Sequence, residues 1–196
     1  DHRDLHSFPT RRSSDLKFCI ENNIPMVSGT TGWLNKKEEI DNLCKEKDGS
    51  FFYALNFSIG VNLLFHYNKL IASMMNNYLQ YDVSLEETHH TEKLDAPSGT
   101  AITLANDIIG SIDKKKKWVN VKSGSDSSKS KEVIIVSKRE NNVPGTHVIK
   151  YDSDVDSIEI KHSAHSREGF ALGAVLAAEW IVGKKGVFGM GDMLDI

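Results

Sequence analysis

Several features that mark specialised classes of protein are scarce or missing in this chain. Two cysteines in 196 residues are too few for the disulfide framework that holds small secreted domains together. The 24 basic and 27 acidic residues give a net charge of −3, without the basic excess of a nucleic-acid-binding protein. No apolar run reaches the ~20 residues of a membrane span, because the densest run is interrupted by Glu179. We therefore expect a cytoplasmic globular protein with reduced cysteines, whose partners include neither nucleic acid nor membrane.

The first third of the chain has the pattern of a parallel α/β sheet. Ile24–Val27 is a short apolar run that predicts a buried strand, and it ends in the small-residue loop Ser28–Gly32. A helix with Asn35 as its predicted cap follows, and Phe51–Leu55 predicts a second strand. In such sheets ligands bind beyond the carboxyl ends of the strands. No Gly-x-x-Gly-x-x-Gly turn, the usual cradle for a dinucleotide pyrophosphate, follows the first predicted strand.

The pattern then changes to a long helix and alternating strands. Ser58 is placed to cap the helix, and Tyr81–Glu87 alternates apolar with polar residues, as a half-buried strand does. Three further strands are predicted at Val133–Val136, His147–Tyr151 and Ser157–His162. The lysine run Lys114–Lys117 and the segment Ser123–Lys131 are predicted to be solvated loops. The fold class is thus α/β, with a partial Rossmann-like parallel sheet and an α+β domain whose mixed sheet is largely antiparallel.

The stretch from Glu87 to Ala101 carries the chemistry. Two adjacent histidines and a lysine precede a Pro-Ser-Gly-Thr turn, and the apolar-periodic run Ala101–Ile109 predicts a helix after it. Ser98 or Thr100 can cap this helix. A helix N-terminus with free amides attracts an anion, and imidazole and ammonium groups beside it can supply protons. The stretch therefore predicts a site that binds a small acid and protonates it.

This stretch reads Glu-x-His-His-x-x-Lys-x-Asp-Ala-Pro-Ser-Gly-Thr-Ala, and it resembles the signature of the 4-hydroxy-tetrahydrodipicolinate reductase family, also called dihydrodipicolinate reductases. Every fixed position of that signature is met. Gly29–Gly32, Asn56–Ser58 and Val143–Thr146 also resemble segments of this family, in the same order. The resemblance extends from about Leu16 to Ile196.

The resemblance implies an N-terminal Rossmann domain joined to a substrate-binding domain that forms a homotetramer through an open sheet. Residues 17–57 and 170–196 are expected to belong to the nucleotide domain, and residues 58–169 to the substrate-binding and tetramerisation domain. Residues 1–16 have no apolar period and are expected to be a non-native leader. Because the glycine turn is missing, the chain is expected to be N-terminally truncated.

The resemblance also implies an activity and its residues. The family reduces 4-hydroxy-tetrahydrodipicolinate to tetrahydrodipicolinate with NADH or NADPH, in lysine and diaminopimelate biosynthesis, and the substrate is a dicarboxylate. The catalytic positions match His89 and Lys93. The substrate-binding positions match His90, Gly99 and Thr100. The cofactor-binding positions match Gly29, Thr30, Thr31, Leu55, Asn56, Phe57 and Ser58. His165 and Arg167 are weaker candidates, open between site and solvated face.

Three alternatives stay open. A metal site is disfavoured because adjacent histidines cannot easily bind one ion and no other Cys or His lies at ligand spacing, so no metal is predicted. The chain can also be a non-catalytic module that assembles and binds dicarboxylate. A different two-domain reductase of similar plan is the third alternative. The choice between NADH and NADPH is left open, because the residues that recognise the 2′-phosphate are expected in the missing part.

Overall fold

The computed structural model describes residues 9–121 and 131–196, which form two compact units. Unit 1 combines the described residues up to Asn62 with Glu168–Ile196, and unit 2 is Leu63–Arg167. Residues 1–8 of the predicted leader, and nearly all of the predicted loop 123–131, lie outside the described residues. The rest of the leader belongs to a helix in which Ser13 and Leu16 are buried. The non-native origin of the leader stays a prediction.

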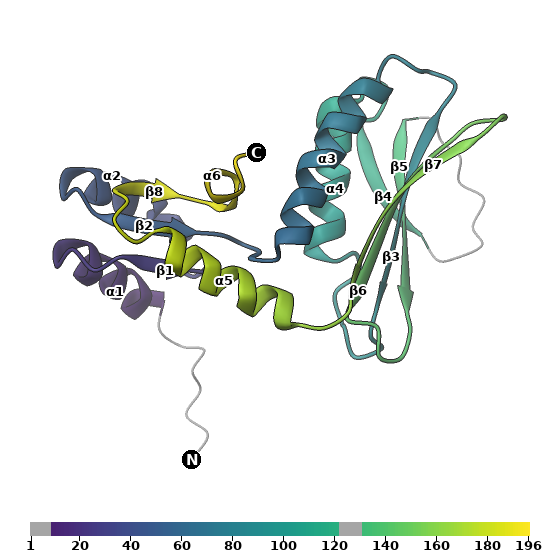
Figure 1. Cartoon of the computed structure of the whole chain (residues 1–196). Coiled ribbons are helices and arrows are strands. Elements are labelled where there is room, and N and C mark those ends of the chain that lie inside the picture. The colour runs from purple at the N-terminus through teal and green to yellow at the C-terminus, as the bar shows by residue number, and fades with distance from the viewer. Residues whose placement is uncertain (1–8, 122–130) are drawn as a thin grey trace. The chain divides into compact units, whose positions relative to one another are not determined.

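Unit 1 is built on a three-stranded parallel sheet with the order β1-β2-β8 (Figure 1). Its strands are β1 (Met26–Ser28), β2 (Ser50–Tyr53) and β8 (Gly186–Phe188). Its helices are α1 (Pro9–Glu21), the 3-10 turn η1 (Leu34–Lys36), α2 (Lys37–Glu46), α5 (Glu168–Trp180) and α6 (Met190–Leu194). The two strands predicted in this region are confirmed, whereas β8 was not predicted.

Apolar side chains on both faces of β2 explain why helices cover both sides of this sheet. Phe51 packs in a cluster with Ile20 of α1 and Ile40 of α2. The next residue, Phe52, packs in a second cluster with Ala177 of α5. Successive strand residues point to opposite faces, so a strand with consecutive buried residues needs cover on both sides. This layering is that of the predicted α/β class.

The predicted cap of α2 is wrong. Asn35 lies inside η1, and α2 begins two residues later without a side-chain cap. The 3-10 turn supplies backbone hydrogen bonds at this helix start, including the one from Lys36 N–H to the Trp33 carbonyl at 2.8 Å. A turn of this kind satisfies amide groups that a capping side chain would otherwise take.

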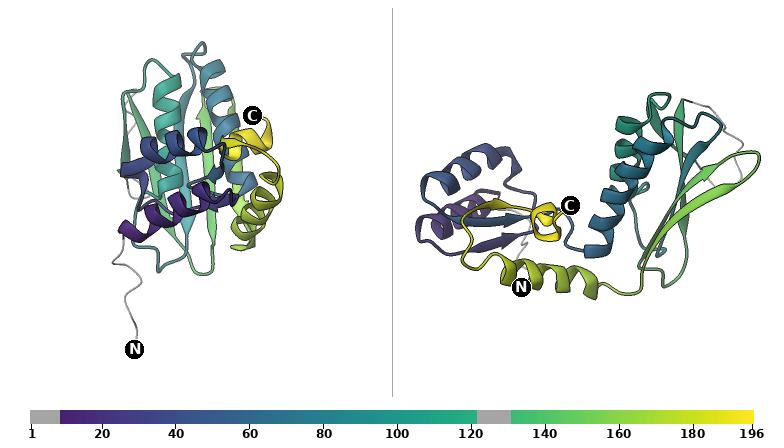
Figure 2. Two further views of the ribbon diagram at one scale, coloured as in Figure 1. Left: turned by 90° about the vertical axis from the view of Figure 1, so that its left-hand side faces the viewer. Right: turned by 45° about the horizontal axis from the view of Figure 1, so that its top comes forward.

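Unit 2 has a five-stranded sheet with the order β4-β5-β3-β6-β7. The strands are β3 (Asp82–His89), β4 (Lys117–Val121), β5 (Glu132–Arg139), β6 (Gly145–Asp152) and β7 (Ser157–Ala164). The helices are α3 (Ile59–Met75), which belongs to this unit from Leu63 on, and α4 (Gly99–Ser111). Both helices lie on one face of the sheet (Figures 1 and 2). The buried side chains of these helices pack against buried residues of β3, β5 and β6, such as Leu85, Ile135 and Ile149.

The sheet of unit 2 is mixed, as predicted, but it is less antiparallel than predicted. β4–β5 and β5–β3 pair in parallel, whereas β3–β6 and β6–β7 pair antiparallel. α4 lies between β3 and β4, which therefore run in the same direction, each parallel to β5. A helical crossover returns the chain in the same direction.

One lysine of the predicted surface run is buried. Lys115 has a fully buried side chain whose ammonium lies 2.6 Å from Asp82 Oδ1. It also donates a hydrogen bond to the Glu132 carbonyl at 2.6 Å. A buried cation is tolerated when it is paired and hydrogen-bonded. A sequence run of lysines gives no sign of such a partner, so the predicted exposure is wrong at this position.

Both cysteines are free thiols, with Cys44 buried and Cys19 half-buried. Among the described helices, none has the length and apolar character needed to cross a membrane.

Candidate functional site

The inward-facing residues of β3 change from apolar to polar at its carboxyl end. Val83 and Leu85 are buried in the core, and Glu87 and His89 continue the same face and are also buried. His89 is thus the last residue of the strand, which extends two residues beyond the predicted end at Glu87. The alternation of the strand brings Glu87 Oε2 within 3.5 Å of His89 Nδ1.

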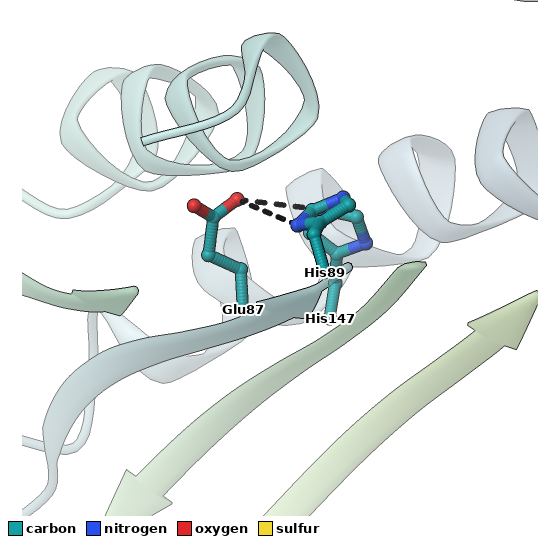
Figure 3. Close-up of side chains that lie close together, drawn as sticks. All are labelled: Glu87, His89 and His147. Carbon is teal, nitrogen blue, oxygen red and sulfur yellow. Dashed lines mark ion pairs between the residues drawn. The ribbon is translucent and has the colours of Figure 1, made fainter. Parts of the chain in front are cut away.

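A third buried polar residue joins them from the neighbouring strand. His147 of β6 lies directly opposite Glu87 in the antiparallel register. Its Nε2 is 3.9 Å from Glu87 Oε2, and its ring meets that of His89 edge to face at 5.1 Å. All three side chains project from the same face of the sheet (Figure 3).

The N-terminus of α4 opens onto this cluster. Of the two predicted caps, Ser98 and Thr100, Ser98 is the cap, because its Oγ accepts the Ala101 amide at 3.2 Å. The Ser98 amide itself donates to both oxygens of Glu87, at 3.1 and 3.0 Å. Of the amides that the first turn leaves without helical partners, only those of Gly99 and Thr100 have no hydrogen-bond acceptor among the described residues. Two adjacent free amides at a helix start can bind an anion.

The predicted catalytic lysine lies in the loop between β3 and α4. Lys93 Nζ is 2.7 and 2.8 Å from the two carboxylate oxygens of Asp95, which lowers the pKa of Asp95. The Lys93 amide donates to the His90 carbonyl, which closes a turn. The positive charge of Lys93 is close enough to lower the pKa of His89. The loop therefore holds a cation beside the buried cluster.

Burial controls the charge of the two cluster histidines. It lowers the pKa of His147 to about 4, with a smaller contribution from His89. Burial also lowers the pKa of His89, although the Glu87 carboxylate opposes this shift. For Glu87, burial favours the neutral form, but hydrogen bonds from Ser98 outweigh it and lower the pKa. At neutral pH the cluster thus contains one carboxylate and two neutral imidazoles.

The hydrogen bonds around Ser98 agree with a neutral His147. Ser98 Oγ already accepts the Ala101 amide, and it lies 3.2 Å from His147 Nε2. The Ser98 hydroxyl both accepts and donates a hydrogen bond when it gives its own proton to His147 Nε2. That arrangement would place the ring proton of His147 on Nδ1, which is buried and has no hydrogen-bond partner among the described residues.

We predict that acid destabilises the protein through these histidines. An unfolded histidine binds a proton near pH 6.5, whereas folded His147 does so only near pH 4, so the unfolded state binds more protons between these values. The free energy of unfolding should therefore fall as the pH is lowered from 7 to 5, by about 2 kcal/mol for His147 alone. Glu87 contributes little in this window, because its pKa is lowered from an already acidic value.

Urea denaturation at pH 7 and pH 5 tests this prediction. His147→Asn removes the titrating group and should make the loss of stability on acidification smaller. An equal loss in the wild type and in the variant would show that His147 is not responsible.

The cluster also has the composition of a metal site. One ligand atom from each of Glu87, His89 and His147 lies within 4.8 Å of the others. The sequence analysis did not group these three residues, because His147 lies on β6, far along the chain from Glu87 and His89. However, both oxygens of Glu87 already accept the Ser98 amide, and Arg139 lies 3.5 Å from one of them. These contacts use part of the acceptor capacity of the Glu87 carboxylate, which has two oxygens with two lone pairs each.

The predicted cofactor residues lie together at one edge of the unit 1 sheet. Gly29, Thr30 and Thr31 follow β1, and Leu55–Ser58 follow β2, its parallel neighbour. The two loops touch, because a Cβ at Gly29 would lie 3.0 Å from Phe57 Cε2. Asn56 Oδ1 accepts the Ser58 amide at 2.9 Å, and Ser58 caps α3 as predicted. Leu55 is largely exposed.

Sequence reasoning missed Glu87, Arg139 and His147 as members of the site. The sequence did contain a signal for Glu87, because every second residue of this strand faces the core and Glu87 follows Val83 and Leu85 in that alternation. A carboxylate at such a position needs a partner. Arg139 and His147 could be assigned to the site only from the registers in which β5 and β6 pair with β3. The weaker candidates His165 and Arg167 lie exposed between β7 and α5.

The chain is similar to known proteins over nearly its whole length. The family described as "Dihydrodipicolinate reductase, C-terminus" matches residues 60–194. The 4-hydroxy-tetrahydrodipicolinate reductase of Christiangramia forsetii is 48% identical over 189 residues, which span 96% of this chain and 77% of that protein. The enzyme of the same name from Clostridium novyi is 36% identical over 190 residues, 96% and 74% of the two chains.

Among solved structures, a dipicolinate-bound dihydrodipicolinate reductase from Paenisporosarcina sp. TG-14 has a similar fold, with a TM-score of 0.75. The similarity covers 94% of this chain and 69% of that chain, at 23% sequence identity.

Proposed function

This chain belongs to the dihydrodipicolinate reductase family of oxidoreductases, and we propose that it binds 4-hydroxy-tetrahydrodipicolinate and reduces it to tetrahydrodipicolinate with NADH or NADPH. The observation that carries the proposal is the pair of free amides at Gly99 and Thr100, in the same strand–loop–helix segment as His89 and Lys93. An anion site next to a proton donor suits a carboxylate substrate whose reduction requires a proton. The reaction would serve lysine and diaminopimelate synthesis in the cytoplasm.

The start of α4 would bind one carboxylate of the substrate. Its two free amides point out of a helix whose dipole favours negative charge at this end. Gly99 is exposed, and a Cβ there would meet no atom within 4 Å, so the approach to its amide is open. His90 lies at the entrance of the same loop and would contact the other part of the dicarboxylate.

Lys93 would supply the proton. Hydride addition to the conjugated ring leaves negative charge, which a positioned acid neutralises. Overall, substrate, NAD(P)H and one proton give tetrahydrodipicolinate, NAD(P)⁺ and water. His89 is neutral at pH 7 because burial lowers its pKa. A bound dianion would favour its protonated form, so His89 would assist only once substrate is present.

The loops after β1 and β2 fit the nicotinamide end of the cofactor. They lie at the carboxyl edge of a parallel sheet, where ligands bind in this architecture. Gly29 is exposed, and Thr30, Thr31, Asn56 and Ser58 provide polar groups that would orient a carboxamide. When bound, NADH or NADPH supplies the hydride.

Two measurements on the same preparation test the proposed function. NADH and NADPH oxidation with freshly generated substrate reports catalysis, and calorimetric titration with dipicolinate reports dicarboxylate binding. We expect both in an active enzyme. Binding without oxidation would support the alternative of a non-catalytic module, and loss of oxidation in chelator would favour a metal site. The absence of both activities would contradict the proposal.

We also propose that the uncovered face of the unit 2 sheet assembles a homotetramer. Ile134, Val136 and Val148 are half-buried on the face away from α3 and α4, although they are apolar. Apolar patches of this kind mark interfaces. Val148→Asp should therefore give a smaller species in light scattering, whereas Val155→Asp makes the same change at a largely exposed position and should not. A monomeric wild type at micromolar concentration would contradict tetramerisation.

A further inference from the structure

Glu87 connects the sheet to the start of α4. Its side chain is completely buried on β3, and both carboxylate oxygens accept the Ser98 amide. By taking this amide, Glu87 leaves only the next two, those of Gly99 and Thr100, for a ligand. The position of the carboxylate thus sets where the anion site begins.

Arg139 connects the same carboxylate to the loop that carries Lys93. Both of its terminal nitrogens lie 3.5 Å from Glu87 Oε1. Its Nε donates to the Lys93 carbonyl at 3.2 Å, and its Nη2 donates to the Asp95 carbonyl at 2.6 Å. A guanidinium can hold several acceptors in a fixed plane, which an ammonium cannot do.

β3 and β5 supply these two residues from adjacent strands. His89 pairs with Arg139 in the parallel register, two residues beyond Glu87. Nη1 of Arg139 also donates to the Lys138 carbonyl at 2.7 Å, which further fixes the guanidinium group. The Glu87–Arg139 ion pair therefore fixes two separate parts of the site. One is the loop that carries Lys93, called the lysine loop below, and the other is the start of α4.

We propose that Glu87 and Arg139 are positioning residues, which hold the backbone of Lys93 and the free amides of Gly99 and Thr100 in one geometry for substrate. This inference rests on the proposed function for its catalytic consequence. The competing explanation is an ion pair that only stabilises the fold. Buried ion pairs contribute little net stability in many proteins, so the two explanations must be separated by local and catalytic measurements.

The chain contains a matched control for a purely structural role. Lys115 also pairs with a carboxylate of β3, Asp82 at the opposite end of the strand, and also donates to a carbonyl of β5. Lys115→Ala should lower the melting temperature without changing the lysine loop. Arg139→Lys keeps the charge beside Glu87 but cannot hold both carbonyls, and Glu87→Gln keeps the shape but removes the charge.

Hydrogen exchange measured by mass spectrometry tests the positioning directly. In Arg139→Lys and Glu87→Gln, amides in residues 90–98 should exchange roughly tenfold faster than in the wild type. The core peptides of β3 should be unchanged, and Lys115→Ala should leave residues 90–98 as in the wild type. Unchanged exchange in the loop, or equal acceleration in the Lys115 control, would overturn the inference.

Kinetics then separate this inference from the proposed function. Arg139→Lys should lower kcat about 10²-fold, as misplacement of a reacting group by an ångström does, and should weaken dipicolinate binding, while KM for NADH stays constant. An active wild type with an unimpaired Arg139→Lys variant would overturn the inference alone. An inactive wild type would refute the proposed reaction, and the exchange experiment would still decide the positioning role.

Discussion

Lys93→Ala should lower the turnover number about 10²–10⁴-fold, the range in which a general acid contributes to catalysis. The reason is that no other cation of the loop can deliver a proton from the same place: Lys93 is held at the mouth of the buried cluster by Asp95. KM for NADH should not change, since the predicted cofactor loops are formed by unit 1. Initial rates of NADH oxidation at saturating substrate measure the effect.

A matched lysine controls for the change in net charge. Lys116 is exposed and lies outside the loop, so Lys116→Ala should keep the wild-type rate. A Lys93→Ala enzyme with wild-type turnover would remove this residue from the mechanism and leave His89 as the remaining candidate acid.

Gly173→Ala is expected to be one of the most damaging single substitutions in unit 1. A Cβ at this position of α5 would lie 1.8 Å from the Phe57 carbonyl oxygen and 2.8 Å from its carbon. Backbone cannot move aside as a flexible side chain can, so either α5 or the loop Asn56–Ser58 must shift. We expect a loss of about 3 kcal/mol in the free energy of unfolding and weaker NADH binding, because that loop is a proposed cofactor contact.

Gly110→Ala makes the same chemical change in a helix where nothing lies within 4 Å of the added carbon. It should stabilise the protein by about 0.5–1 kcal/mol, since alanine favours helix more than glycine does. Chemical denaturation of both variants, with NADH titration by fluorescence, measures the contrast. Equal stabilities of the two variants would mean that α5 can retreat from the loop at little cost.

Local sequence signals predicted the elements that depend on local physics. The cap at Ser98 follows from a hydroxyl before an apolar-periodic run, and β1 and β2 follow from short apolar runs between loops. Resemblance to the family added the grouping of the predicted site residues, whose roles stay predictions. The family and the α/β fold class are confirmed.

The failures of prediction involve partners that are distant in sequence. Glu87 meets His147 and Arg139 only through the registers of β3 with β6 and β5. Lys115 is buried only because Asp82 and the Glu132 carbonyl receive it. β8 has three residues, too few for a periodic signal, and it becomes a strand because β2 offers a pairing edge. A short stretch of sequence around each residue gives no information about such contacts.

The pairing of β8 with β2 has a consequence for synthesis on the ribosome. Unit 2 is one continuous segment and is complete in sequence at Arg167, whereas β8 and α5 are translated after it. Domains generally fold as units in the order in which they emerge. Unit 2 can therefore fold before β8 is available to pair with β2 in the sheet of unit 1. A nascent chain stalled after Arg167 would present β2 with an open edge, which is a binding site for chaperones or for β8 supplied in trans.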